Sequence, residues 1–219
     1  NSIQLYPTFT NKLYATLINE GQFTSSQGFL ILNSGATHIN RGNITVSADK
    51  LAIQGSPFTN EASGIIMGKG TLDVSSVSFT NSGSISPGLS PGILNVTGTQ
   101  YQTESSMINI EIGGKVVDSE YDQLKHTGNV ALDGHLNIAL IDDFIPDLGD
   151  VFDVMTHASS TGEFSRFSGR STGKGFSFEV EQAASYVRLT AVEPYNILPY
   201  VENPIGDLEL NEDFDDPVI

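Results

Sequence analysis

Residues 18–42 read INEGQFTSSQGFLILNSGATHINRG, and this stretch begins and ends with the same kind of turn, an Asn followed two residues later by a Gly. The turn returns at Asn81, and a variant of it begins at Asn60, where Gly64 follows four residues later, so that the Asn residues lie 21, 20 and 21 positions apart. The residues that define this repeat are Asn19, Asn40, Asn60 and Asn81, with Gly21, Gly42 and Gly83. A fixed period of this length is typical of proteins built from stacked repeats.

Short runs of alternating apolar residues keep the same period. They begin at Leu30, Leu51, Leu72 and Leu94, which lie 21, 21 and 22 residues apart. One such repeat cannot bury its own apolar face, but stacked repeats share a continuous core. Each strand residue advances the chain by about 3.3 Å, so about 21 residues with their turns are enough for one coil of a parallel β-helix. The repeat therefore predicts a right-handed parallel β-helix of about 21 residues per coil.

The repeated Asn and Gly residues have a structural interpretation. An Asn at the same turn of each coil can adopt a left-handed conformation and pair its amide with the Asn of the next coil. The Gly two residues later would supply a positive φ without steric cost. We therefore predict a structural ladder along the helix, with a ligand site as the alternative.

Composition and charge exclude several classes of protein. Hydrophobic residues make up 38% and charged residues 16% of the chain, which has no cysteine and no apolar run long enough to span a bilayer. The net charge is −16, and residues 101–219 carry 22 acids and six bases, whereas residues 1–100 carry four of each. Nucleic-acid binding needs clustered Lys or Arg, so we expect no nucleic-acid partner.

The end of the repeat resembles a known group of proteins. Residues 81–98 read NSGSISPGLSPGILNVTG, and residues 121–124 read YDQL. Together with the segment that closes at Gly162-Glu-Phe164, they resemble the C-terminal part of the passenger β-helix of autotransporter-like and filamentous-haemagglutinin-like bacterial adhesins. The resemblance covers roughly residues 60–164. It implies a β-helix that works at a bacterial surface.

The strand pattern changes after the coils. Residues 130–141 alternate apolar and polar residues around Asp133-Gly134, which predicts a hairpin. Residues 176–180 and 186–192 predict a further antiparallel pair. We accordingly expect parallel coils over residues 1–112, final coils with an antiparallel β cap over 113–193, and an extended acidic linker or donor strand over 194–219 that leads to a further domain.

The acidic tail suggests two activities. Residues 203–214 read NPIGDLELNEDF, which resembles the opening strand of a cadherin-like repeat. The resemblance implies Ca²⁺ as the candidate cofactor, with a solvated linker as the alternative. The candidate calcium ligands are Glu212, Asp213, Asp215 and Asp216. An alternating segment could instead add to the sheet edge of another subunit, and its candidate partner-binding residues are Leu208, Leu210 and Phe214. Asp142, Asp143, Asp147 and Asp150 form a second acidic cluster, for which an ordinary loop is the alternative.

No catalytic motif accompanies the repeat. A β-helix enzyme acting on polysaccharides would need a pair of carboxylates on one face, and stacking would place Glu20, Arg41 and Glu61 in one row, which favours a surface ion-pair ladder. We expect a non-enzymatic structural component of an extracellular bacterial surface, secreted or cell-surface, adhesin-like or self-assembling into a filament or layer. Its partners would be copies of itself, neighbouring domains of the same chain, or cell-surface glycans or proteins. The alternative is a carbohydrate-binding or polysaccharide-degrading β-helix protein.

Overall fold

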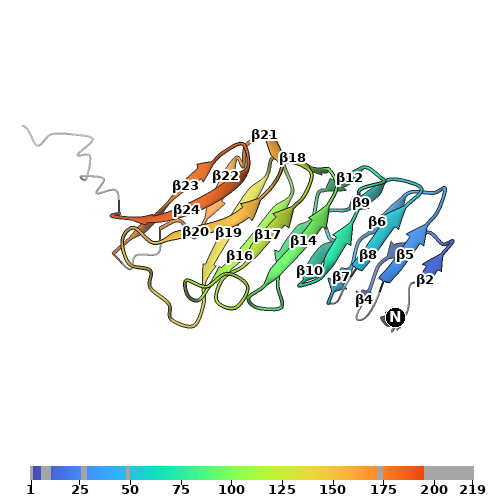
Figure 1. The fold of residues 1–219 in the computed structure, drawn as a ribbon, viewed down its shortest axis with the longest axis horizontal. Coiled ribbons are helices and arrows are strands. Elements are labelled where there is room, and N and C mark those ends of the chain that lie inside the picture. Colours follow the sequence, from blue (N-terminus) through green and yellow to red (C-terminus); the bar gives the residue numbers. More distant parts are fainter. Residues whose placement is uncertain (1, 6–10, 26–28, 48–49, 172–174, 195–219) are drawn as a thin grey trace, which may run out of the picture.

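The computed structural model of the chain describes residues 2–5, 11–25, 29–47, 50–171 and 175–194. Over these ranges the chain forms 24 strands and no helix. The strands stack along the long axis of the molecule, from β2 (Asn11–Leu13) at one end to β23 (Ser177–Gln182) at the other (Figure 1). The prediction of an all-β protein with stacked parallel strands is confirmed.

The strands belong to three sheets, which the chain visits in turn. Each strand from β1 to β19 pairs in parallel with the strand three places later in the sequence. We call three successive strands, one from each sheet, a circuit. This stacking is compatible with a parallel β-helix, because every circuit lies on the one before it.

The first sheet contains eight strands: β1 (Ser2–Leu5), β4 (Gln22–Ser25), β7 (Asn43–Val46), β10 (Ile65–Gly68), β13 (Ser84–Pro87), β16 (Met107–Ile112), β19 (His135–Leu140) and β22 (Arg166–Ser168). The second contains β2, β5 (Phe29–Asn33), β8 (Lys50–Gln54), β11 (Thr71–Asp73), β14 (Ile93–Thr97), β17 (Gln123–His126), β20 (Val151–Thr156), β24 (Tyr186–Val192) and β23. The third contains β3 (Ile18–Asn19), β6 (His38–Asn40), β9 (Phe58–Asn60), β12 (Phe79–Asn81), β15 (Gln100–Gln102), β18 (Asn129–Leu132) and β21 (Ser159–Gly162).

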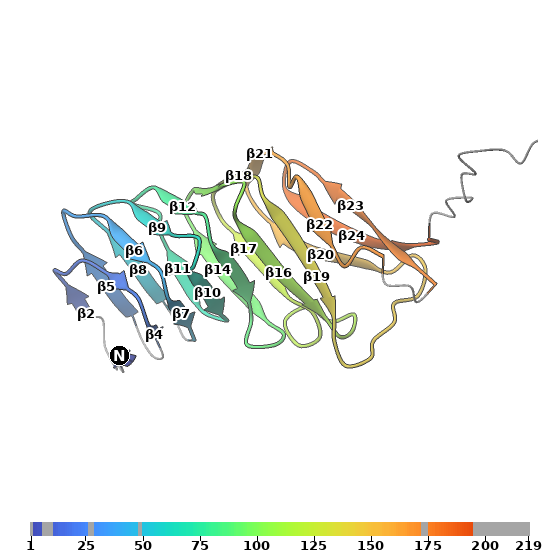
Figure 2. The same ribbon diagram turned by 180° about the vertical axis from the view of Figure 1, so that it is seen from behind.

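The circuits lengthen toward the C-terminal end. Asn19 of β3 lies beside Asn40 of β6, 21 positions further along the chain. By contrast, Asn109 of β16 lies beside Asn137 of β19, 28 positions further along. The extra residues lie in the connections from the first sheet to the second, residues 113–122 and 141–150. These loops project along one edge of the stack in Figure 1, and Figure 2 shows them at the same edge from behind, so the long loops gather on one side of the molecule.

The core consists of rows of identical or similar residues that run from circuit to circuit. In the first sheet, Ile44, Ile66, Ile85 and Ile108 occupy successive inward positions and are fully buried. In the third sheet, the Phe58 and Phe79 rings stack with their centroids 5.0 Å apart. Apolar burial of this kind is the main favourable term in folding, so the repeat of apolar positions and the stack of strands have the same cause.

Two sequence expectations need correction. Leu72 of β11 lies beside Val96 rather than Leu94, because β14 is shifted by two residues, a shift that keeps the same face inward. Residues 130–141 do not form a hairpin. β18 and β19 lie in different sheets and pair with neighbouring circuits, and Asp133-Gly134 is the corner between them, with Gly134 at a φ of 79°.

The last strands run the other way. β23 and β24 form the antiparallel pair that the sequence predicted, and β24 also pairs antiparallel with β20. This pair therefore forms the C-terminal end of the second sheet, with β23 as the edge strand. Among the described residues, no helix is long and apolar enough to cross a lipid bilayer.

Candidate functional site

The repeated Asn residues form a continuous row of side-chain hydrogen bonds inside the stack. Asn19, Asn40 and Asn60 each donate from Nδ2 to Oδ1 of the next Asn, at 2.7 Å in all three cases, and Asn81 donates to Gln102 Oε1 at 2.8 Å. The first three amides also donate to a backbone carbonyl of the following circuit. These amides are buried and hydrogen-bonded to other protein atoms, so we expect the row to stabilise the fold.

The glycines of the repeat have a different role from the one that the sequence suggested. Neither the four Asn residues nor Gly21, Gly42 and Gly83 have a positive φ. Instead, a Cβ on Gly42 would lie 2.2 Å from the backbone oxygen of Gly21, and one on Gly83 would lie 2.2 Å from that of Gly64. Gly is required here because the backbones of neighbouring circuits approach so closely that there is no room for a Cβ atom.

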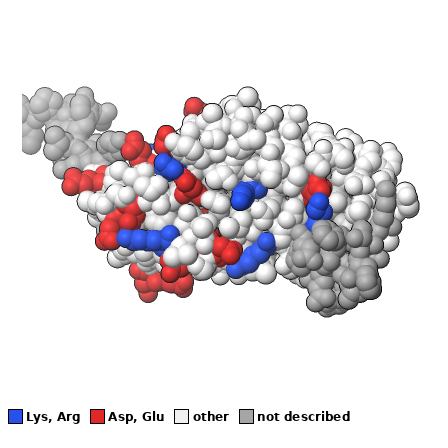
Figure 3. Space-filling model, viewed as in Figure 1, with Lys and Arg blue, Asp and Glu red and all other residues white. Residues whose placement is uncertain are grey.

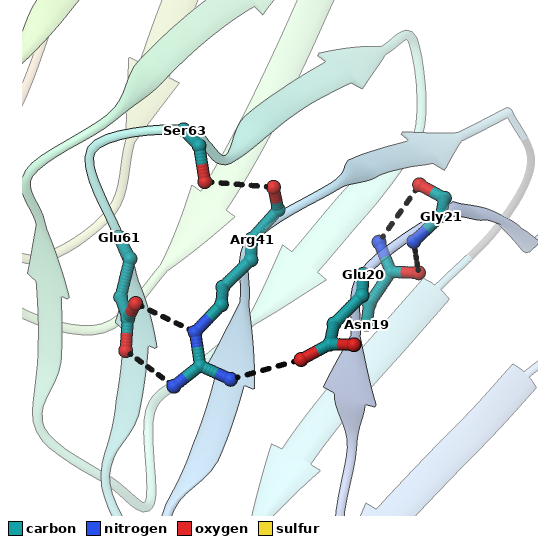
Figure 4. A network of polar contacts seen from close by, with 6 residues as sticks. All are labelled: Asn19, Glu20, Gly21, Arg41, Glu61 and Ser63. Atoms are coloured by element: carbon teal, nitrogen blue, oxygen red, sulfur yellow. Dashed lines mark hydrogen bonds and ion pairs between the residues drawn. The ribbon is translucent and has the colours of Figure 1, made fainter.

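An ion-pair row runs outside the Asn row (Figure 4). Arg41 donates from Nε to Glu61 at 2.8 Å and from Nη1 to Glu20 at 3.3 Å. A second pair joins Lys50 Nζ to Asp73 at 2.8 Å. The carboxylates of Glu20 and Glu61 are therefore separated by the guanidinium. Both carboxylates are thus engaged by one guanidinium, in the ion-pair row that the sequence favoured.

The acidic residues gather at the C-terminal end. Figure 3 shows them over β20, β23, β24 and the adjoining loops, whereas the other end of the same face is mostly uncharged. Lys115, in the loop after β16, pairs with two acids of the loop before β20, Asp147 at 2.9 Å and Asp150 at 2.8 Å. Across the described ranges, which include the acidic loop at residues 141–150, no three His, Cys, Asp or Glu side chains are grouped so as to hold a metal ion.

The tail residues named by the sequence lie outside the part of the chain that the structure describes. These are the calcium candidates Glu212, Asp213, Asp215 and Asp216, and the partner-binding candidates Leu208, Leu210 and Phe214.

A cavity of about 330 Å³ lies on the looped edge of the stack, where β13 and β16 turn toward the second sheet. We call it the corner cavity. It is lined by Met67, Ser86, Pro87, Gly88, Leu89, Ser90, Asn109, Glu111 and Asp122. The two Ser-Pro-Gly turns, residues 86–88 and 90–92, thus meet Asp122 at this corner.

Asp122 holds this corner together. Its side chain is 2% exposed, and it accepts hydrogen bonds from the backbone N–H of Gly92 at 2.7 Å and of Glu111 at 3.0 Å. A Cβ on Gly88 would lie 2.7 Å from Asp122 Oδ1, so Gly lets the turn close over the carboxyl group. Burial raises the pKa of Asp122 to about 7, although the two N–H donors oppose this shift.

Glu111 is the accessible acid of the corner cavity. It is half-buried on the outer face of β16, where its neighbour on β19 is the small residue Ala139. In the described part of the chain, no hydrogen bond or ion pair reaches the Glu111 carboxylate. An unpaired carboxylate beside apolar walls is suited to binding a cationic group.

A second group of polar residues lies inside the core. His126 and His157 are 4% and 6% exposed and occupy successive positions of one inward row, because Lys125 pairs with Thr156. Among the residues that the structure describes, neither ring nitrogen of His126 has a hydrogen-bond partner, nor do the side-chain amide atoms of Gln100. Burial lowers the pKa of His126 to about 3 and also lowers the pKa of His157.

Sequence reasoning missed both groups. Glu111 and Asp122 lie on opposite sides of a loop, and Ser86 lies a whole circuit earlier in the chain, so nothing in their spacing joins them. The one available signal was the double Ser-Pro-Gly turn, which marks a corner of the stack. The separation of His126 and His157 matches the longer C-terminal circuits and not the repeat of the Asn residues.

Comparison with known proteins supplies no family for this arrangement. No protein-family model matches the chain, and no curated protein matches it.

Proposed function

We propose that the chain is a non-enzymatic structural component of an extracellular bacterial surface, adhesin-like or self-assembling into a filament or layer. In this proposal the circuits are coils of a right-handed parallel β-helix whose first coils have the period of the Asn row. The antiparallel strands β23 and β24 cap it, and the chain is secreted or displayed on the cell.

The observation that carries the proposal is the continuous buried Asn row. Four successive hydrogen bonds between side-chain amides connect the circuits along the axis. Such a row stiffens a long stack without providing chemistry, because its amides bond to one another and to the backbone. A stiff, elongated body with a mostly uncharged exterior over its first circuits supports a role in display or assembly.

The first experiment tests assembly and adhesion. Purified full chain is examined by size-exclusion chromatography with light scattering, and beads coated with it are tested for attachment to cell and matrix surfaces. We expect multimers or specific attachment, and beads coated with heat-unfolded chain are the control. A strictly monomeric chain that attaches to no surface would contradict the proposal.

A second experiment tests the absence of catalysis. The chain is incubated with a panel of polysaccharides, and new reducing ends and unsaturated products are measured. We expect no turnover. Turnover that is abolished by Glu61→Gln or Asp73→Asn would show that the coils carry an active site, and the structural proposal would then be wrong.

Carbohydrate binding without turnover is the second candidate function. It is favoured by a row of amides and hydroxyls on the outer face of the first sheet. Asn109 donates to Ser86 at 3.1 Å, Asn137 donates to Asn109 at 3.0 Å, and Ser168 donates to Asn137 at 2.5 Å. Groups of this kind hydrogen-bond sugar hydroxyls, and a glycan array with the labelled full chain tests this candidate directly.

A further inference from the structure

The corner cavity combines an apolar wall with one free charge. Met67, Pro87 and Leu89 supply apolar surface, and the Leu89 side chain, 53% exposed, stands at the rim. At about 330 Å³, the cavity lies at the small end of ligand sites. It therefore has the size for one long side chain rather than for a large cofactor.

The charged residues of the cavity indicate the charge of the ligand that it would bind. Asp122 is buried and bonded to two backbone N–H groups, which leaves Glu111 as the carboxylate that a ligand can reach. Lys69 lies against Gly92, since a Cβ on Gly92 would lie 2.5 Å from Lys69 Cε, and its charge acts on the buried Asp122, but Lys69 does not line the cavity. The lining thus presents one accessible negative group among apolar side chains.

The surroundings favour a basic partner. In the described part of the chain, residues 101–171 and 175–194 carry 15 acids against five bases, and this excess attracts positively charged polypeptides over distances of about a Debye length. The polar residues Ser86 and Asn109 stand at the same wall and can accept a hydrogen bond from an ammonium group.

From this combination we propose that the corner cavity binds the side chain of a lysine presented by a basic partner polypeptide. The aliphatic stem packs against Met67, Pro87 and Leu89, and the ammonium group reaches Glu111. Lysine is assigned because its longer aliphatic stem can cover the apolar wall and its compact ammonium is a point charge, whereas arginine carries a shorter stem and a broad planar guanidinium. This site goes beyond the structural role, which does not require it.

The experiment uses small probes and the full chain. NMR spectra are recorded while Nα-acetyl-lysine methylamide is added, and the signals of the Met67 methyl group, the Gly88 amide and the Asn109 side chain are followed. The matched probe is the norleucine derivative, which has the same stem without the ammonium, and the arginine derivative is the third. For a single side chain we expect a Kd on the order of 1–10 mM.

Two variants test the assigned roles, and one serves as the control. Glu111→Gln should weaken lysine binding about tenfold, because it removes the charge and keeps the shape. Leu89→Ala should weaken it less, and it keeps the test valid if Glu111→Gln disturbs folding. Glu179→Gln removes an exposed acid from β23, far from the cavity, and should leave binding unchanged.

Shifts confined to the cavity with lysine, absent with norleucine and lost in Glu111→Gln, support the proposal. Equal binding of norleucine would show an apolar pocket without charge selection, and tighter binding of arginine would assign the wrong side chain. Unchanged lysine binding by Glu111→Gln would remove the assigned ligand group. Any of these three results overturns the proposal, and none of them bears on the structural role.

Discussion

A single buried side chain in this stack can hydrogen-bond to the circuits on both sides of its own. The fully buried Asn60 accepts a hydrogen bond from Asn40 and donates one to Asn81. Asn60→Ala leaves a buried donor on one side and a buried acceptor on the other, each costing about 1–3 kcal/mol. We expect the free energy of unfolding to fall by about 2–4 kcal/mol, as measured by urea denaturation.

The neighbouring Thr59 provides the control for Asn60. It lies on the same strand with its side chain on the outer face, where substitutions away from special features change stability by about 0.5 kcal/mol or less. A loss for Asn60→Ala as small as that for Thr59→Ala would show that the Asn row contributes little to stability.

His126 and Asp122 affect stability in opposite directions with pH. The unfolded chain protonates His126 near pH 6.5 but the folded chain only near 3, so stability falls as pH decreases between these values. Asp122 is protonated near pH 7 when folded and near 3.8 when unfolded, so its contribution grows as pH decreases over that range. Each slope is about 1.4 kcal/mol per pH unit, and from pH 6.5 to 4 the two slopes largely cancel.

Replacing one of the two groups should expose the slope of the other. His126→Leu removes one of the two buried histidines with a lowered pKa, leaves His157 in place, and fills most of the space of the imidazole with apolar atoms. Relative to the unchanged chain, this variant should therefore gain stability steadily as pH is lowered from 6.5 to 4. Asp122→Asn should show the reverse trend over the same range. Urea denaturation at pH 4, 5 and 6.5 measures both, and parallel pH profiles for the three proteins would contradict the assigned pKa shifts.

At the scale of the strand and its turn, the closeness of neighbouring circuits is the controlling feature. A Cβ on Gly42 would lie 2.2 Å from the oxygen and 2.6 Å from the nitrogen of Gly21, so backbone would have to move. We expect Gly42→Ala to reduce the free energy of unfolding by about 1–3 kcal/mol, as overpacking does.

Gly35 provides the matched control for Gly42. It is exposed, has no positive φ and would place a Cβ in open space. Gly35→Ala should therefore leave stability unchanged or raise it by about 0.4–1 kcal/mol, because the unfolded chain loses freedom. Equal destabilisation by the two substitutions would show that close approach is not the reason for Gly42.

The sequence allowed the regular part of the fold to be predicted, because a repeat in the sequence corresponds to a repeat of contacts. Asn19, Asn40, Asn60 and Asn81 lie in register as their spacing indicated. The role of Gly42 could not be read, because a positive φ and a close backbone approach both select Gly. The hairpin predicted at Asp133-Gly134 was wrong for a similar reason. The residues of a turn do not indicate whether the next strand pairs with the one before it or continues into another sheet.

The candidate site was less predictable than the fold. The corner cavity depends on how the turns around Gly88 and Gly92 close over Asp122. That closure follows from circuits whose lengths depart from the repeat. The row through His126 and His157 has the same origin. The sequence repeat therefore predicted the stacked strands, whereas the corner cavity and the buried histidines lie where the length of the circuits changes.

At the scale of the whole molecule, each circuit contacts mainly its two neighbours, as the strand pairing shows. Stability in such a stack is close to a sum of the stabilities of single circuits and of the interfaces between them. A defect in one circuit should weaken the adjacent interfaces first, and its effect should decline along the axis.

Hydrogen exchange of Asn60→Ala measures this decline. The amides of β6, β9 and β12 should lose the most protection, those of β3 and β15 less, and those of β23 and β24 the least. The pattern follows because the Asn60 side chain bonds directly to Asn40 and Asn81 and to no Asn further along the axis. An equal loss of protection from β3 to β24 would instead show that the stack unfolds as one cooperative unit, and interface energies could then not be assigned to single circuits.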